Sequence, residues 1–147
     1  MDHRLRELSH TADVGFEVRA PALEELFEGA ARGLVQALGV EPAGGAPRPD
    51  PEPVLLARPD LDRLLVHWLR ELLARAMAAG EVPEAEVRAV DPGEEGDASL
   101  RADVRWRPAS DEGPAREIKG VTYHGLRVAR EGEDPDAGWH ARVVLDV

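Results

Sequence analysis

Apolar and polar residues alternate in two short stretches near the start of the chain, and this pattern predicts strands over 5–8 and 14–19. The pattern then changes. From 21 to 38 apolar residues recur every three or four positions, with Pro21 at the start and Gly39 just beyond the end. That spacing predicts an amphipathic helix that buries one face.

A second helix is predicted over 60–79 on the same grounds. Asp60 is a good N-cap, leucines and Trp68 form the apolar stripe, and Gly80 follows the last helical residue. Between the two helices, the glycines and prolines of 39–53 predict a loop, and a short strand is expected over 54–57.

The remainder of the chain alternates again and predicts strands. A hairpin is expected from 85–90 and 100–107, followed by strands over 126–129 and 139–147. Helices mixed with antiparallel hairpins, without regular strand–helix alternation, indicate an α+β class. We therefore expect one domain over 1–147, a mostly antiparallel or mixed β-sheet covered by two amphipathic helices.

Composition narrows the possible functions. The formal net charge is −11, which disfavours direct binding to a phosphate backbone unless a local basic patch intervenes. The chain has no cysteine, so any metal must use oxygen or histidine ligands, and the cytoplasm is the expected compartment. No apolar run approaches the length of a membrane span, so we expect no membrane association.

One basic residue differs from all the others. Of the 18 Lys and Arg residues, Lys119 is the only lysine. If coding bias replaces Lys by Arg wherever the exchange is harmless, the surviving lysine marks a site that needs a compact, flexible ammonium. The alternative is chance survival.

Carboxylates near both ends of the chain are the candidate metal ligands. Asp13 closes the segment 10–13, and Asp146 precedes Val147. Alternation in the last predicted strand points Asp146 away from the core. Two carboxylates with a main-chain oxygen would form a partial calcium-type site. The structural alternatives are a turn residue for Asp13 and an exposed strand end for Asp146.

Histidines could orient such ligands. His10 and His124 are expected to lie in loops, where either could act as an outer partner of a metal ligand. A metal-dependent hydrolase is disfavoured, because no general base and nucleophile can be paired at a plausible spacing.

Three segments together resemble the archease family. They are SHTADVGF at 9–16, with the LEELF that opens the first helix at 23–27; IKGVTYH at 118–124; and VVLDV at 143–147. The resemblance spans the whole chain. Gly120 departs from the alanine expected in the second segment, which would loosen the backbone beside Lys119.

The resemblance implies a cytoplasmic accessory protein that is not itself an enzyme. Archeases activate RtcB-type RNA ligases in tRNA splicing or RNA repair, speeding guanylation of the ligase and sustaining multiple turnover. Carried over here, a divalent metal, usually taken to be calcium, would be held by Asp13, Asp146 and the main-chain or terminal carboxylate oxygen of Val147. Lys119 matches the family lysine and would contact the ligase complex, with RNA contacted at most indirectly.

A second role has also been suggested for this family. It is chaperone-like modulation of another RNA-processing enzyme, such as a tRNA methyltransferase. The sequence does not separate the two roles.

Overall fold

The structure, a computed structural model of the chain, describes residues 4–9, 13–45 and 48–147, and for 4–9 and 13 it defines the backbone only. Both predicted helices and every predicted strand are present. In chain order the elements are β1 (Arg4–Ser9), β2 (Asp13–Ala20), α1 (Leu23–Leu38), β3 (Glu52–Arg58), α2 (Leu61–Ala79), β4 (Glu81–Asp91), β5 (Ala98–Pro108), β6 (Gly120–Arg130) and β7 (Trp139–Asp146).

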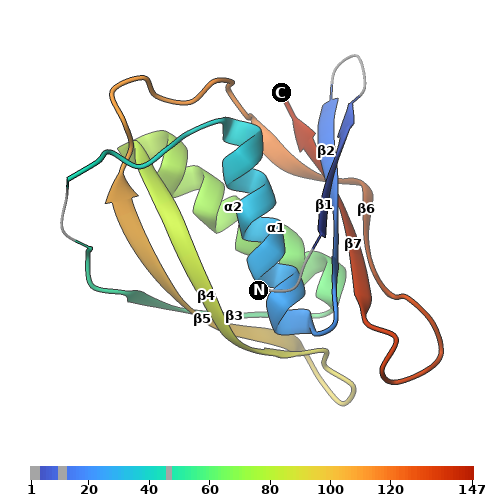
Figure 1. Cartoon of the computed structure of the whole chain (residues 1–147). Helices are drawn as coiled ribbons and strands as arrows, with labels where there is room; N and C mark the ends of the chain where they lie inside the picture. Colours follow the sequence, from blue (N-terminus) through green and yellow to red (C-terminus); the bar gives the residue numbers. More distant parts are fainter. Residues whose placement is uncertain (1–3, 10–12, 46–47) are drawn as a thin grey trace.

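The strands form two antiparallel sheets with the two helices between them (Figure 1). One sheet has the order β1-β2-β7-β6 and the other β3-β5-β4. The α+β class is confirmed, and the strands are divided between two sheets where the sequence suggested one. The division is possible because α1 buries residues around much of its circumference, so it can contact β2 and β4 at the same time.

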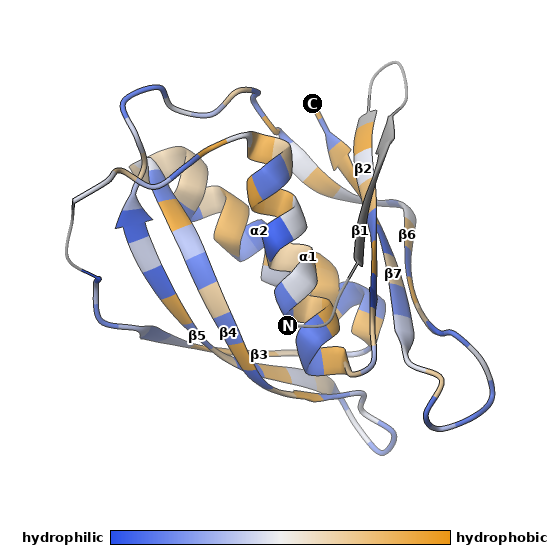
Figure 2. Ribbon diagram, viewed as in Figure 1, coloured by the Kyte–Doolittle hydropathy of each residue, from blue (hydrophilic) through white to orange (hydrophobic). Residues whose placement is uncertain are grey.

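The core lies between the helices and the two sheets. Trp68 of α2 is completely buried, and its indole N–H donates to the main-chain oxygen of Phe27 in α1 over 3.0 Å. That bond removes the cost of burying the indole N–H and ties the two helices together. Figure 2 shows the matching alternation of polar and apolar residues along β4 and β5.

The helix ends are formed by the residues that the sequence suggested. The Asp60 carboxylate accepts the main-chain N–H of Arg63 over 2.8 Å at the start of α2. Gly39 and Gly80 end the two helices in the left-handed conformation, with φ of 66° and 65°. At the start of α1, Ala22 provides no side-chain cap.

Several strands extend beyond their predicted bounds, and the early starts of β3 and β6 have a clear physical reason. β3 begins at Glu52 and so includes Pro53, which is tolerated because β3 is an edge strand. β6 begins at Gly120, six residues before the predicted strand at 126. The alternation of apolar and polar residues fails at the start of β6 because the β6–β7 register shifts between Thr122 and Arg127.

Within the described part of the chain, no helix combines the length and apolar character needed to cross a bilayer.

A glycine in α1 allows the helix to approach β2 closely. A Cβ on Gly33 would lie 2.5 Å from Cε2 of Phe16, whose ring is almost fully buried. Replacing glycine by alanine within a helix normally stabilises the helix by about 1 kcal/mol. Forcing a methyl against the ring should cost about 1–3 kcal/mol, so we expect Gly33→Ala to lower the melting temperature in circular dichroism.

Phe16→Leu provides the matched background for this test. The loss caused by Gly33→Ala should be smaller in Phe16→Leu than in the wild type, because the two positions are in contact. A higher melting temperature for Gly33→Ala alone would contradict this packing.

Candidate functional site

Three segments that are distant in sequence meet at one end of the four-stranded sheet. Asp13 at the start of β2 is paired with Asp146 at the end of β7, and Asp146 is paired with Gly120 at the start of β6. The main-chain N–H of Lys119 donates to the Asp146 carbonyl oxygen over 2.7 Å. This meeting follows from antiparallel pairing, because the last residues of β7 must lie beside the first residues of both neighbours.

The described side chains at this end are accessible. Asp146 and Lys119 are exposed, and Val147 is half-buried. The alternating residues Val143 and Leu145 are completely buried, so Asp146 lies on the sheet face away from the helices, as the alternation predicts. For Asp13 only the backbone is described, and His10 lies outside the described residues.

The lysine lies on a segment that is held on both sides. Ile118 and Val121 are each only 2 % exposed and anchor the chain around exposed Lys119. Arg70 of α2 adds a second anchor, since its Nε and Nη2 donate to the Val121 carbonyl oxygen over 3.1 and 2.9 Å. No pattern in the sequence indicated this role for Arg70, because the role depends on a tertiary contact.

A groove of about 630 Å³ lies beside Lys119, between α2 and the segment 117–121. Arg70 and Met77 line it from the helix. Tyr123 is 44 % exposed nearby, with the Arg70 guanidinium 5.1 Å from its ring centre. The lysine therefore sits next to a partly apolar surface that a partner protein can contact.

His124 does not lie in a loop, which corrects that expectation. It belongs to β6, in the irregular stretch between Thr122 and Arg127, and its main-chain N–H donates to Thr122 Oγ1 over 3.0 Å. Thr122 already pairs with Val144, so the register carries His124 away from the Asp146 end. Its suggested role beside a metal ligand stays a prediction.

The donors at the Asp13–Asp146 end suit a hard cation. Calcium and magnesium prefer carboxylate and carbonyl oxygens with water completing the shell. The Asp146 carbonyl oxygen already accepts a hydrogen bond from the Lys119 N–H. The main-chain oxygen of Val147 is therefore the next possible metal ligand along the chain. No three His, Asp or Glu side chains gather as a metal site among the residues whose side chains are described.

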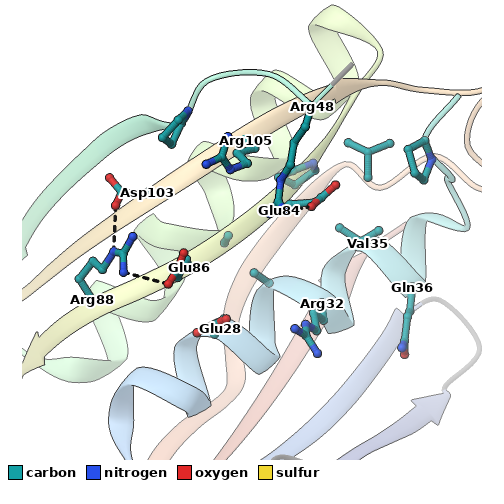
Figure 3. Close-up of a pocket in the computed structure, with 16 residues that line it drawn as sticks. Glu28, Arg32, Val35, Gln36, Arg48, Glu84, Glu86, Arg88, Asp103 and Arg105 are labelled. Atoms are coloured by element: carbon teal, nitrogen blue, oxygen red, sulfur yellow. Dashed lines mark hydrogen bonds and ion pairs between the residues drawn. The ribbon is translucent and has the colours of Figure 1, made fainter. Parts of the chain in front are cut away.

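A second groove, of about 530 Å³, lies between α1, β4 and the proline-rich loop (Figure 3). Four arginines and four acidic residues line it. Arg88 pairs with Glu86 over 2.8 Å and with Asp103 over 2.9 Å. These charges largely balance one another. The groove lies along the three-stranded sheet, whereas Asp146 belongs to the four-stranded sheet.

Carboxylates of α1 cover the free edge of β4 beside this groove. The main-chain N–H groups of Val87 and Val90 donate to Glu28 over 3.4 Å and to Glu24 over 3.3 Å. Burial raises the pKa of the Glu28 carboxyl above its ordinary value, although the Val87 N–H and Arg32 act to lower it. Helix side chains thus protect a sheet edge that would otherwise be open to pairing.

Comparison with known proteins gives one consistent family. The model of the archease protein family matches residues 5–147. The archease of Methanosarcina mazei is 34 % identical, with 95 % of this chain and 93 % of the relative covered. That of Archaeoglobus fulgidus is 35 % identical, with 98 % and 99 % covered.

Solved structures agree. Protein 1598 of Methanobacterium thermoautotrophicum superposes with a TM-score of 0.71 at 27 % identity, over 97 % of this chain and 98 % of that one. An archease from Thermotoga maritima, described as a possible chaperone, gives 0.59 at 20 % identity and covers all of both chains. The second likeness supports the fold only.

The raised pKa of Glu28 predicts a pH-dependent effect. An acid whose pKa is raised by folding stabilises the protein below its unfolded pKa, and this contribution is lost as pH rises through the folded pKa. Glu28→Gln does not titrate, so its melting temperature relative to wild type should increase between about pH 4 and pH 7. Glu95→Gln, in an exposed turn, is the control. The opposite trend would show that the bond to Val87 outweighs burial.

Proposed function

On the finding that this chain belongs to the archease family, we propose that it is a non-catalytic accessory protein that activates an RtcB-type RNA ligase. The ligase joins RNA ends in tRNA splicing or RNA repair, and this protein speeds its guanylation and sustains multiple turnover. The proposed compartment is the cytoplasm.

The observation that carries the proposal is the meeting of Asp13, Asp146 and Lys119 at one end of the sheet. These residues belong to three different segments, and each segment contains one of the motifs that resemble the family. Antiparallel pairing explains how residues separated by more than a hundred positions can act together.

The proposed metal site consists of Asp13, Asp146 and the main-chain oxygen of Val147. A calcium-like ion held there would supply positive charge able to neutralise phosphate oxygens. The protein's own part is to hold the backbone of Asp13 and Asp146 opposite each other in the sheet, beside exposed Lys119. A partly hydrated ion at such a site is accessible to the ligase complex.

The proposed part of Lys119 is a point charge at the contact with the ligase complex. Its ammonium lies on the anchored segment 118–121, next to the groove lined by Arg70 and Met77. An ammonium can approach a phosphate or carboxylate from many directions, whereas the planar guanidinium of arginine requires a defined orientation. The groove offers apolar area for the same partner.

A chaperone-like role toward another RNA-processing enzyme, such as a tRNA methyltransferase, is the second candidate. We keep it because this chain belongs to the archease family, of which a Thermotoga maritima member is described as a possible chaperone. Co-purification from native cells separates the two, because a methyltransferase recovered without any ligase would support the second role.

Calcium binding provides the first test. In calorimetry, wild type should bind Ca²⁺, while Asp146→Asn and Asp13→Asn should each weaken binding at least about tenfold, since each removes a charged oxygen ligand. Asp97→Asn removes the same charge from an exposed turn and should bind like wild type. Equal weakening by all three variants would indicate nonspecific attraction to an acidic protein.

Ligation by the matching ligase at limiting enzyme provides the second test. Wild type should raise turnover, and Asp146→Asn and Lys119→Met should lose most of that effect at unchanged melting temperature. Lys119→Arg should recover only part of it, because the charge returns without the compact shape. Arg101→Met, at an exposed position on β5, is the matched control. An unchanged turnover with wild type would overturn the ligase role.

A further inference from the structure

The outer face of the four-stranded sheet carries cationic side chains in neighbouring strands. Ala141 and Val143 of β7 are completely buried toward the helices, so His140 and Arg142 lie on the opposite face. The register places Arg142 between Glu17 of β2 and Arg127 of β6. The formal charge of −11 describes the whole chain and conceals this local arrangement.

Two side-chain nitrogens on this face have no hydrogen-bond partner. Arg142 Nε is buried without a hydrogen-bond partner, and so is His140 Nε2, which lies 3.7 Å from Glu17 Oε1. A buried polar nitrogen without a partner loses its hydrogen bonds to water and gains none in return. Arg127 is exposed, and within the described residues it makes no hydrogen bond or ion pair.

Two like charges directly opposite each other on a sheet repel, and Arg127 and Arg142 are such a pair. Glu17 of β2 pairs with Arg142 in the register, and it is the only carboxylate among the described residues directly beside this arginine pair. It already has other partners. On the next row Arg19 pairs with Glu131 over 2.8 Å and remains 53 % exposed. An incoming anion would relieve the repulsion and accept hydrogen bonds from the exposed Arg127 guanidinium.

The face continues to the Asp146 end. Asp146 follows Arg142 by four residues on the same face of β7, which is about 13 Å along a strand. A chain of phosphates lying on the arginines would therefore bring its end near Asp146 and Lys119. At the other side, the backbone of edge strand β1 places Arg4 opposite Arg19 and Arg6 opposite Glu17.

We propose that this outer face, formed by β2, β7 and β6 around Arg127 and Arg142, binds the phosphate backbone of single-stranded RNA. That the polyanion is RNA rests on the proposed function. The net charge led us to expect at most an indirect contact with RNA, and this proposal makes the contact direct. Guanidinium groups contact phosphates without reading bases, so binding is independent of sequence and sensitive to salt. The acidic surface of the rest of the protein keeps this RNA binding weak.

Fluorescence anisotropy with the full chain and a labelled single-stranded RNA of about 20 nucleotides tests this, at several salt concentrations from about 50 mM upward. Wild type should bind at low salt. Arg127→Gln should weaken binding at least about threefold and lower the salt slope by about 0.7, the value of one phosphate contact on a single strand. Arg127→Gln/Arg142→Gln should weaken it further.

Controls separate the possible failures. Arg101→Gln removes an exposed charge from the other sheet and should bind RNA like wild type. Because part of Arg142 is buried, the exposed Arg127→Gln variant alone decides the result if the double variant is unstable. No binding by wild type at low salt, or equal weakening by Arg101→Gln, would overturn the proposal.

Ligase stimulation measured in parallel keeps this proposal distinct from the previous one. Stimulation without RNA binding would leave the ligase role intact and remove the RNA-binding face. RNA binding weakened in Arg127→Gln, with calcium affinity kept, is the expected pattern. If Arg127→Gln instead weakens ligase binding in the absence of RNA, the face contacts an acidic protein surface, and the RNA assignment is wrong.

Discussion

The pairing of β2 with β7 is the constraint on which the rest of the structure depends. It places buried Phe16 beside Val143 and buried Val18 beside Ala141, all facing the helices. A slip of β2 by one residue would turn Phe16 and Val18 to solvent and bring Glu17 into the core. Hydrophobic burial therefore fixes the register, and that same register sets Asp13 opposite Asp146.

Antiparallel order and this register together bring the residues of the proposed site to one end of the sheet. The end of β7 lies beside the starts of β2 and β6, so two carboxylate positions and Lys119 meet although they are far apart in sequence. Arg70 and the buried neighbours of Lys119 hold the third segment in place. The outward face of the same strands carries Arg127 and Arg142, so the proposed metal and phosphate contacts lie on one sheet.

Local features were predictable from sequence. The helices followed from apolar spacing, and Asp60, Gly39 and Gly80 marked their ends because capping depends on neighbouring backbone groups. Composition singled out Lys119, and the residues themselves suggested Asp13 and Asp146 as oxygen ligands. The family resemblance was needed to group them, since spacing alone gave no reason to bring Asp13 to Asp146. The division into two sheets, the anchoring by Arg70 and the early start of β6 depend on contacts between distant segments or on an interrupted register.

The most direct measurement is to locate the metal in solution by nuclear magnetic resonance, with Mn²⁺ as a paramagnetic probe that also prefers oxygen ligands. At low occupancy, the amide signals of Asp13, Lys119, Gly120 and Asp146 should broaden first, because the register places them together. Broadening centred instead on the acidic turn at 91–97 would show that the cation follows surface charge. The strand ends of β2 and β7 would then not be its site.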